Sequence, residues 1–260
     1  MASPGTSGVF VDFDGTLAAI VEAPDQARPR PGAAALLARL AARYARVAVI
    51  SGRPVTYLAE HLGDAGDTEL IGLYGLQRMT VTGAEPDVEA DAAAWRAVVD
   101  TVASEAEAVA PKGLAVERKG LAVTFHFRQA PHLASWAADF ASDRAAASGL
   151  AAHPGKMSWE LRPPVPTDKG TVIAELATGL TAVCFVGDDT GDLPAFAALG
   201  RLRTEGIDTL AVAVAGPETP GELLALADLT VDGPAGVLDL LETLAGRGEP
   251  PSQSQPSPPA

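Results

Sequence analysis

Short apolar runs alternate with segments of helical periodicity in the first and last thirds of this chain. The runs are rich in Val, Ile, Leu and Ala, and their length is typical of buried strands. They span residues 8–13, 46–51, 69–75, 181–189, 209–216 and 229–233, and helical patterns cover 31–45, 54–63, 168–180, 192–200, 221–227 and 234–247. Buried strands that alternate with helices form a parallel sheet with helices on both faces. We therefore expect an α/β fold built on a doubly wound, Rossmann-like parallel sheet.

The middle of the chain has a different pattern. Two long helical patterns cover residues 91–110 and 131–149, with strand patterns at 113–128 between them and at 155–163 after them. Long helices combined with neighbouring strands of this kind are typical of a small α+β unit. The sequence therefore predicts an α+β domain inserted into the doubly wound one.

These changes of pattern set the expected domain boundaries. Residues 1–78 and 165–248 should form the core, and residues 79–164 the inserted domain. The last segment, 249–260, is rich in Pro and Ser, a composition typical of a disordered tail.

The composition restricts the partners of the chain. Its 33 acidic and 19 basic residues give a formal net charge of −14, which argues against binding to nucleic acid or anionic membranes. No apolar stretch is long enough to span a membrane. The single cysteine, Cys184, lies in a strand pattern, which excludes a disulfide framework and indicates a core thiol. We expect a cytoplasmic protein.

Polar side chains follow three of the predicted strands. Asp12 and Asp14 follow the first strand, Ser51 follows the second, and Asp188 and Asp189 follow a later one. A single Asp-Gly pair is typical of a turn, but the carboxyl ends of parallel strands meet at one edge of a sheet, where ligands bind. Clustered carboxylates without matching cations favour Mg²⁺, which takes oxygen ligands and binds phosphate. The sequence therefore predicts a metal and phosphate site at this edge.

Four segments that carry these residues resemble a known family. DFDGTL, ISGRP, TDKG and VGDDTGD occur in the order of the four motifs of the haloacid dehalogenase-like phosphatases. More narrowly, DFDGTLAAIVEAPDQARPRP, VAVISGRP, ERKGLAVTFHFR, WELRPPVPTDKG and CFVGDDTGD resemble the trehalose-6-phosphate phosphatases, from about residue 9 to 245. The resemblance implies the core of this superfamily with an α+β cap as the insert.

The resemblance also implies roles for the residues of the core. Asp12 would be the nucleophile that forms an aspartyl phosphate, and Asp14 would act as general acid and then general base. Mg²⁺ would be held by the Asp12 carboxylate, the Asp14 backbone carbonyl and Asp188. The remaining core residues would bind phosphate or substrate, or support the metal site: Ser51, Gly52, Arg53, Lys169, Asp189 and Asp192. A surface position before Pro54 is the alternative for Arg53.

The strand patterns of the insert offer polar faces for a sugar. In residues 121–128 apolar and polar side chains alternate, which is typical of a half-buried strand. A solvated outer face is one interpretation. The resemblance instead implies that the sugar is bound by four residues of the cap: Glu117, Lys119, Arg128 and Glu160. His126 could contact the sugar or support the hairpin.

The expected function is Mg²⁺-dependent hydrolysis of trehalose 6-phosphate to trehalose and phosphate, a step of trehalose biosynthesis. The alternatives are a phosphatase for sucrose phosphate or mannosyl phosphoglycerate, a phosphomutase, and a non-catalytic module that senses a sugar phosphate. Tyr74 and Gln77 depart from the His and Glu that many members of the family carry in this segment. The sequence does not indicate whether a trehalose-phosphate synthase is a partner.

Overall fold

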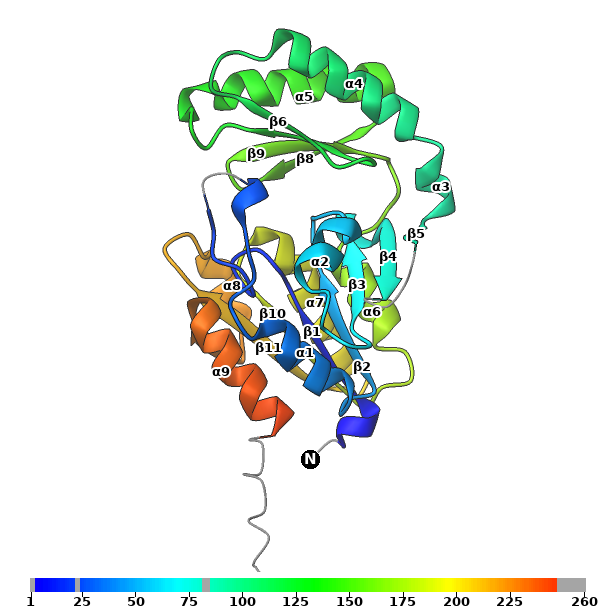
Figure 1. Ribbon diagram of the computed structural model, residues 1–260, viewed down its shortest axis with the longest axis vertical. Coiled ribbons are helices and arrows are strands. Elements are labelled where there is room, and N and C mark those ends of the chain that lie inside the picture. Colours follow the sequence, from blue (N-terminus) through cyan, green and yellow to red (C-terminus); the bar gives the residue numbers. More distant parts are fainter. Residues whose placement is uncertain (1–2, 22–23, 81–84, 247–260) are drawn as a thin grey trace, which may run out of the picture.

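An eight-stranded sheet forms the core of the computed structural model, which describes residues 3–21, 24–80 and 85–246 (Figure 1). The strand order is β12-β11-β10-β1-β2-β3-β4-β5. The strands are β1 (Ser7–Val11), β2 (Arg46–Ile50), β3 (Glu69–Gly72), β4 (Gln77–Thr80), β5 (Asp87–Val88), β10 (Ala182–Gly187), β11 (Asp208–Ala215) and β12 (Leu229–Asp232). Pairing is parallel from β12 to β3 and antiparallel for β4 and β5. The prediction of a mostly parallel, doubly wound sheet is confirmed.

The direction of winding reverses between β1 and β10. From β1 the chain continues through β2 and β3 on one side, and β10, β11 and β12 follow on the other. Phe10 of β1 pairs in register with Phe185 of β10. Such a reversal opens a crevice at the carboxyl ends of the two strands, so the residues that follow β1 and β10 lie at the natural place for a ligand.

Helices cover both faces of this sheet and bury its alternating side chains. Val9 and Val11 pack with Leu37 in one apolar cluster, whereas Phe10 packs with Ile173 in another on the opposite face. The first cluster includes side chains of α1 (Ala33–Ala41), α2 (Val55–His61) and α9 (Gly233–Ala245). The second includes those of α6 (Lys169–Leu176), α7 (Leu193–Thr204) and α8 (Gly221–Leu226). The apolar runs of the sequence are therefore buried on both sides.

A smaller antiparallel sheet, ordered β6-β7-β9-β8, lies above the carboxyl ends of the core strands (Figure 1). Its strands are β6 (Ala115–Arg118), β7 (Val123–His126), β8 (Ala151–Gly155) and β9 (Ser158–Arg162). The helices α4 (Arg96–Val109) and α5 (Ala134–Ser148) cover its outer face, where Phe125 packs edge-on against Phe140. The opposite face, with Thr124 and Glu160 paired across β7 and β9, points towards the core. We call this unit the cap.

Several elements differ from the sequence expectations. The helical pattern at 91–110 forms two helices, α3 (Ala90–Ala93) and α4. The expected domain boundary at residue 79 falls inside β4, and the pairing of β4 with β5 favours a boundary after Val88. The expected disordered tail, 249–260, lies outside the described residues. Within the described ranges, no helix has both the length and the apolar character needed to cross a membrane.

Candidate active site

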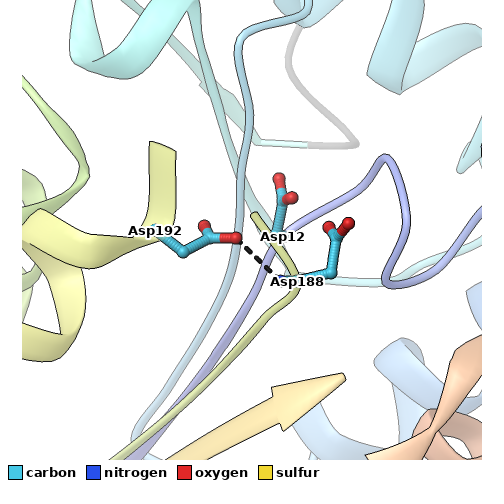
Figure 2. Close-up of side chains that lie close together, drawn as sticks. All are labelled: Asp12, Asp188 and Asp192. Carbon is cyan, nitrogen blue, oxygen red and sulfur yellow. Dashed lines mark hydrogen bonds between the residues drawn. The ribbon is translucent and has the colours of Figure 1, made fainter. Parts of the chain in front are cut away.

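Three aspartates converge at the carboxyl ends of β1 and β10. Carboxylate oxygens of Asp12, Asp188 and Asp192 lie within 4.8 Å of one another. Figure 2 shows the carboxylates of Asp12 and Asp188 pointing to the same side, with Asp192 beside the backbone of Asp188. Asp192 ends the short helix η5 (Thr190–Asp192), and its Oδ2 accepts hydrogen bonds from the backbone N–H groups of Asp188, at 2.8 Å, and Asp189, at 3.1 Å. Asp192 thus fixes the loop that presents Asp188.

Lys169 supplies the buried cation of this cluster. Its Nζ lies 2.8 Å from Asp12 Oδ1 and 2.6 Å from Asp192 Oδ1. Lys169 is the first residue of α6, and Asp168 caps this helix by accepting a hydrogen bond from the backbone N–H of Thr171 at 2.8 Å. The cap fixes where the helix begins, and therefore where the ammonium group enters the site.

The carboxylates outnumber this one cation, and their pKa values reflect the imbalance. Burial raises the pKa of Asp12 well above its ordinary value, although Lys169 opposes the change. Burial, together with the neighbouring Asp189 and Asp192, raises the pKa of Asp188 to about 7. Burial alone would lower the pKa of Lys169, but Asp12 and Asp192 outweigh it and raise that pKa. Perturbed groups gathered in a crevice are typical of a functional site.

The acidic cluster fits a divalent cation. Asp188 is buried, yet its Oδ1 has no hydrogen-bond partner among the residues that the structure describes. A buried carboxylate oxygen without a partner is costly, and a cation held between Asp12 and Asp188 would remove that cost. Asp192 already uses both oxygens in hydrogen bonds, which suits the supporting role expected for it.

Asp14 lies on the turn that follows Asp12, and its carboxylate faces Arg53. The guanidinium binds it through two hydrogen bonds, Nε to Oδ2 at 2.8 Å and Nη2 to Oδ1 at 2.7 Å. Gly15, next along the turn, has φ of 80°, and a Cβ there would overlap the carboxylate of Asp188. Arg53 is 7% exposed, so the alternative of a surface arginine is wrong.

A cavity opens between the core and the cap above Asp12. The core lines it with most of the residues expected for phosphate binding: Asp12, Asp14, Ser51, Gly52, Arg53, Lys169 and Asp189. Ser51 follows β2, and its Oγ accepts a hydrogen bond at 3.1 Å from the backbone N–H of Arg53. The side chain of Asp189 accepts one at 2.8 Å from the backbone N–H of Gly191. Both loops are therefore held in place by their own side chains.

The cap contributes a connected set of charged side chains. Glu160 accepts hydrogen bonds from Lys119 Nζ at 2.8 Å and from Thr124 Oγ1 at 2.9 Å. His126 Nε2 lies 2.7 Å from Glu117 Oε2, so the ring supports Glu117. Burial by itself raises the pKa of Glu117, but the hydrogen bond from His126 and the charge of Lys119 outweigh it and lower that pKa to about 2. The polar face of the cap sheet is thus an ordered network rather than a solvated surface.

Ion pairs link the cap to the core around the cavity. Arg53 Nη1 lies 3.9 Å from Glu117 Oε1. Arg128 pairs with Glu218, on the loop after β11, at 2.9 Å. Lys156, at the turn between β8 and β9, lies 3.2 Å from Glu218 and 3.5 Å from Asp188 Oδ2. Sequence reasoning missed Lys156 and Glu218. The only signal was the confinement of the four lysines of the chain to residues 112–169.

Fold and site together define the class of protein, a doubly wound α/β core with an inserted cap and a carboxylate cluster at the carboxyl ends of its strands. A haloacid dehalogenase-like hydrolase from Bacteroides thetaiotaomicron has this fold, with a TM-score of 0.60 at 15% identity, covering 92% of this chain and 99% of that one. The model of the trehalose-phosphatase family matches residues 10–224. The chain therefore belongs to the trehalose-phosphatase family, and the resemblance noted in the sequence is confirmed.

Two relatives show how far the similarity extends. The trehalose-phosphate phosphatase of Mycolicibacterium paratuberculosis is 34% identical over 257 residues, with 93% of this chain and 62% of that protein covered. The C-terminal domain of trehalose-6-phosphate phosphatase from C. albicans has a similar fold, with a TM-score of 0.76 at 22% identity and 93% of each chain covered. The chain thus spans less than two thirds of the length of its mycobacterial relative.

Proposed function

We propose that this chain hydrolyses trehalose 6-phosphate to trehalose and phosphate through an aspartyl phosphate on Asp12. The observation that carries the proposal is the position of Asp12 Oδ1, 2.8 Å from Lys169 Nζ, on a cavity whose opposite wall is the polar face of the cap. Phosphoryl transfer depends mainly on positioning and on neutralising charge. Both are supplied by the residues that line this cavity.

Asp12 attacks the phosphorus, and the bond from phosphorus to the sugar oxygen breaks. Asp14 gives its proton to the departing oxygen and later takes one from the water that hydrolyses the aspartyl phosphate, which releases phosphate and frees Asp12. Arg53 orients the Asp14 carboxylate for both transfers through its paired hydrogen bonds. Ser51 and Lys169 hold the phosphoryl oxygens.

Asp12, the backbone carbonyl of Asp14 and Asp188 are the ligands we propose for Mg²⁺, with Asp189 and Asp192 as support. When bound, the cation would neutralise charge on the phosphoryl oxygens. Among the residues that the structure describes, Oδ1 of Asp188 has no hydrogen-bond partner, which supports this assignment. Mg²⁺ suits a site of this kind because it takes carboxylate oxygens together with phosphate.

The cap selects the sugar. We assign contacts with sugar hydroxyls to Glu117, Lys119 and Glu160, whose charged groups face the cavity or join its hydrogen-bond network. Arg128 also lines the cavity, and it would leave Glu218 to contact the substrate. Gly52 also lines the cavity, and we assign it a backbone contact with the substrate beside Ser51. A cytoplasmic location fits a chain whose single cysteine is a buried, free thiol.

Phosphate release from a panel of sugar phosphates tests the proposal. With Mg²⁺ present, we expect the highest kcat/KM for trehalose 6-phosphate, compared with sucrose 6-phosphate, mannosyl phosphoglycerate and glucose 6-phosphate. Preference for another member of the panel would assign a different sugar phosphatase. Transfer of phosphate to a second sugar would indicate a phosphomutase, and binding without turnover would indicate a sensing module.

A further inference from the structure

Tyr74 has an unusual backbone conformation for a large side chain. Its φ and ψ are 58° and 28°, in the left-handed region, where residues other than glycine are uncommon. Two contacts hold it there: its backbone N–H donates to Ser51 O at 3.1 Å, and its carbonyl accepts from Thr167 Oγ1 at 2.8 Å. Strain that is held by neighbouring structure is typical of functional sites. Ser51 lies on the phosphate-binding loop after β2, and Thr167 lies on the loop that precedes Lys169.

The ring of Tyr74 lies across the phosphate-binding loop. A Cβ on Gly52 would come within 2.7 Å of the Tyr74 hydroxyl oxygen, so the ring reaches this position because residue 52 is glycine. The ring also faces the guanidinium of Arg162, whose Cζ lies 4.7 Å from the ring centroid. The loop and the end of β9 thus fix the ring between the core and the cap.

The side chain of Tyr74 borders two neighbouring cavities. The first holds Asp12, Ser51 and Lys169, and the second is lined by cap residues that include Glu160. The two cavities share Tyr74 with four other residues: Lys119, His126, Lys156 and Asp189. Among these shared residues, Tyr74 supplies the only side-chain hydroxyl. A substrate that extended from the first cavity into the second would lie beside these shared residues, Tyr74 among them.

The hydroxyl of Tyr74 is available to such a substrate. Within the described residues it makes no hydrogen bond, although it lies close to the charged network of Lys119 and Glu160. Burial, with the nearby Glu160, raises the pKa of Tyr74, so the group stays protonated and remains a hydrogen-bond donor. Tyr74 is half-buried, so a ligand that enters these cavities can reach the hydroxyl and supply an acceptor for it.

We propose that Tyr74 is a specificity-determining residue whose hydroxyl donates a hydrogen bond to the sugar of a sugar phosphate monoester, where the substrate extends from the phosphoryl site into the cap. This inference rests on the proposed function. A substrate that covers the hydroxyl but places no sugar oxygen beside it leaves the hydroxyl unpaired. Binding of such a substrate is therefore disfavoured. Tyr74 therefore selects for sugar esters over simple phosphate monoesters.

Tyr74→Phe removes the hydroxyl and keeps the ring that faces Arg162. We would measure kcat and KM on trehalose 6-phosphate and on p-nitrophenyl phosphate, which has no sugar hydroxyls. We expect the ratio of the two kcat/KM values to fall by about fivefold to tenfold relative to the wild type, mainly through a higher KM for the sugar ester. Tyr44→Phe is the matched control, because Tyr44 donates to Leu244 O far from the cavities. Its ratio should equal that of the wild type.

Three other results are informative. An unchanged ratio in Tyr74→Phe, with a wild type that prefers trehalose 6-phosphate, would overturn the role of Tyr74 and leave the proposed function intact. An equal loss on both substrates, with a lower melting temperature, would make Tyr74 a structural residue and also overturn the inference. A wild type that hydrolyses p-nitrophenyl phosphate but no sugar phosphate would overturn both proposals.

Discussion

Arg53 binds Asp14 through a paired contact, with Nε 2.8 Å from Oδ2 and Nη2 2.7 Å from Oδ1. A planar fork of donors fixes the direction of a carboxylate, whereas the ammonium of lysine is a point charge. We therefore expect Arg53→Lys to lower kcat on trehalose 6-phosphate by about tenfold to a hundredfold through misplacement of Asp14. Arg28→Lys is the control, because Arg28 binds Asp25 O at 2.7 Å outside the cavity. Equal kcat values in the two variants would contradict this role of Arg53.

Lys169 compensates two buried carboxylates, Asp12 and Asp192. Lys169→Met leaves both without their cation, and we expect the free energy of unfolding in urea to fall by about 3 kcal/mol. The double variant Lys169→Met/Asp192→Asn carries one buried charge fewer and should recover part of this loss without recovering activity. Stability of the single variant equal to that of the wild type would show that the pairing does not stabilise the fold.

Mg²⁺ should stabilise the folded chain because it would bind the native acidic cluster. At about 100 times its dissociation constant, a bound ion adds about 2.7 kcal/mol to the free energy of unfolding. We expect Mg²⁺ to raise the melting temperature of protein treated with EDTA. Asp188→Asn removes a carboxylate whose Oδ1 has no partner within the described part of the chain, and it should abolish this rise. A rise of the same size in the variant would place the ion elsewhere.

The lowered pKa of Glu117 predicts that the stability of the fold depends on pH. Its pKa is lowered from an ordinary value of 4.5 to about 2 in the folded state, so the unfolded chain binds the proton more readily. The stabilisation is complete above about pH 4.5 and is lost as the pH falls towards 2. The difference in unfolding free energy between the wild type and Glu117→Gln should therefore be constant from pH 6 to 5 and shrink from pH 4.5 to 3. A difference that does not change down to pH 3 would contradict this account.

The sequence predicted that core residues of the site would meet at one edge of the sheet, for a physical reason. Asp12, Ser51 and Asp188 each follow a buried strand, and parallel strands bring such residues to one edge whatever the details of packing. The capping residues Asp168 and Thr171 likewise fix the start of α6 and the position of the lysine by local chemistry.

The cap side was less predictable because it depends on contacts between distant segments. β8 carries Pro154 and lies at the edge of its sheet, so its pattern does not indicate a strand. Lys156 follows it and reaches Asp188 only through the placement of the cap on the core. The pairing of Arg128 with Glu218, 90 residues further along the chain, has no local signal either.

The central claim is that Asp12 carries the phosphoryl group during hydrolysis of trehalose 6-phosphate. Rapid acid quenching of the enzyme during turnover of trehalose 6-phosphate labelled at phosphorus, followed by peptide mapping, tests it directly. We expect label on the peptide that contains Asp12, and neither label nor phosphate release with Asp12→Asn. Phosphate release by Asp12→Asn at the wild-type rate, or label on a different residue, would contradict the account.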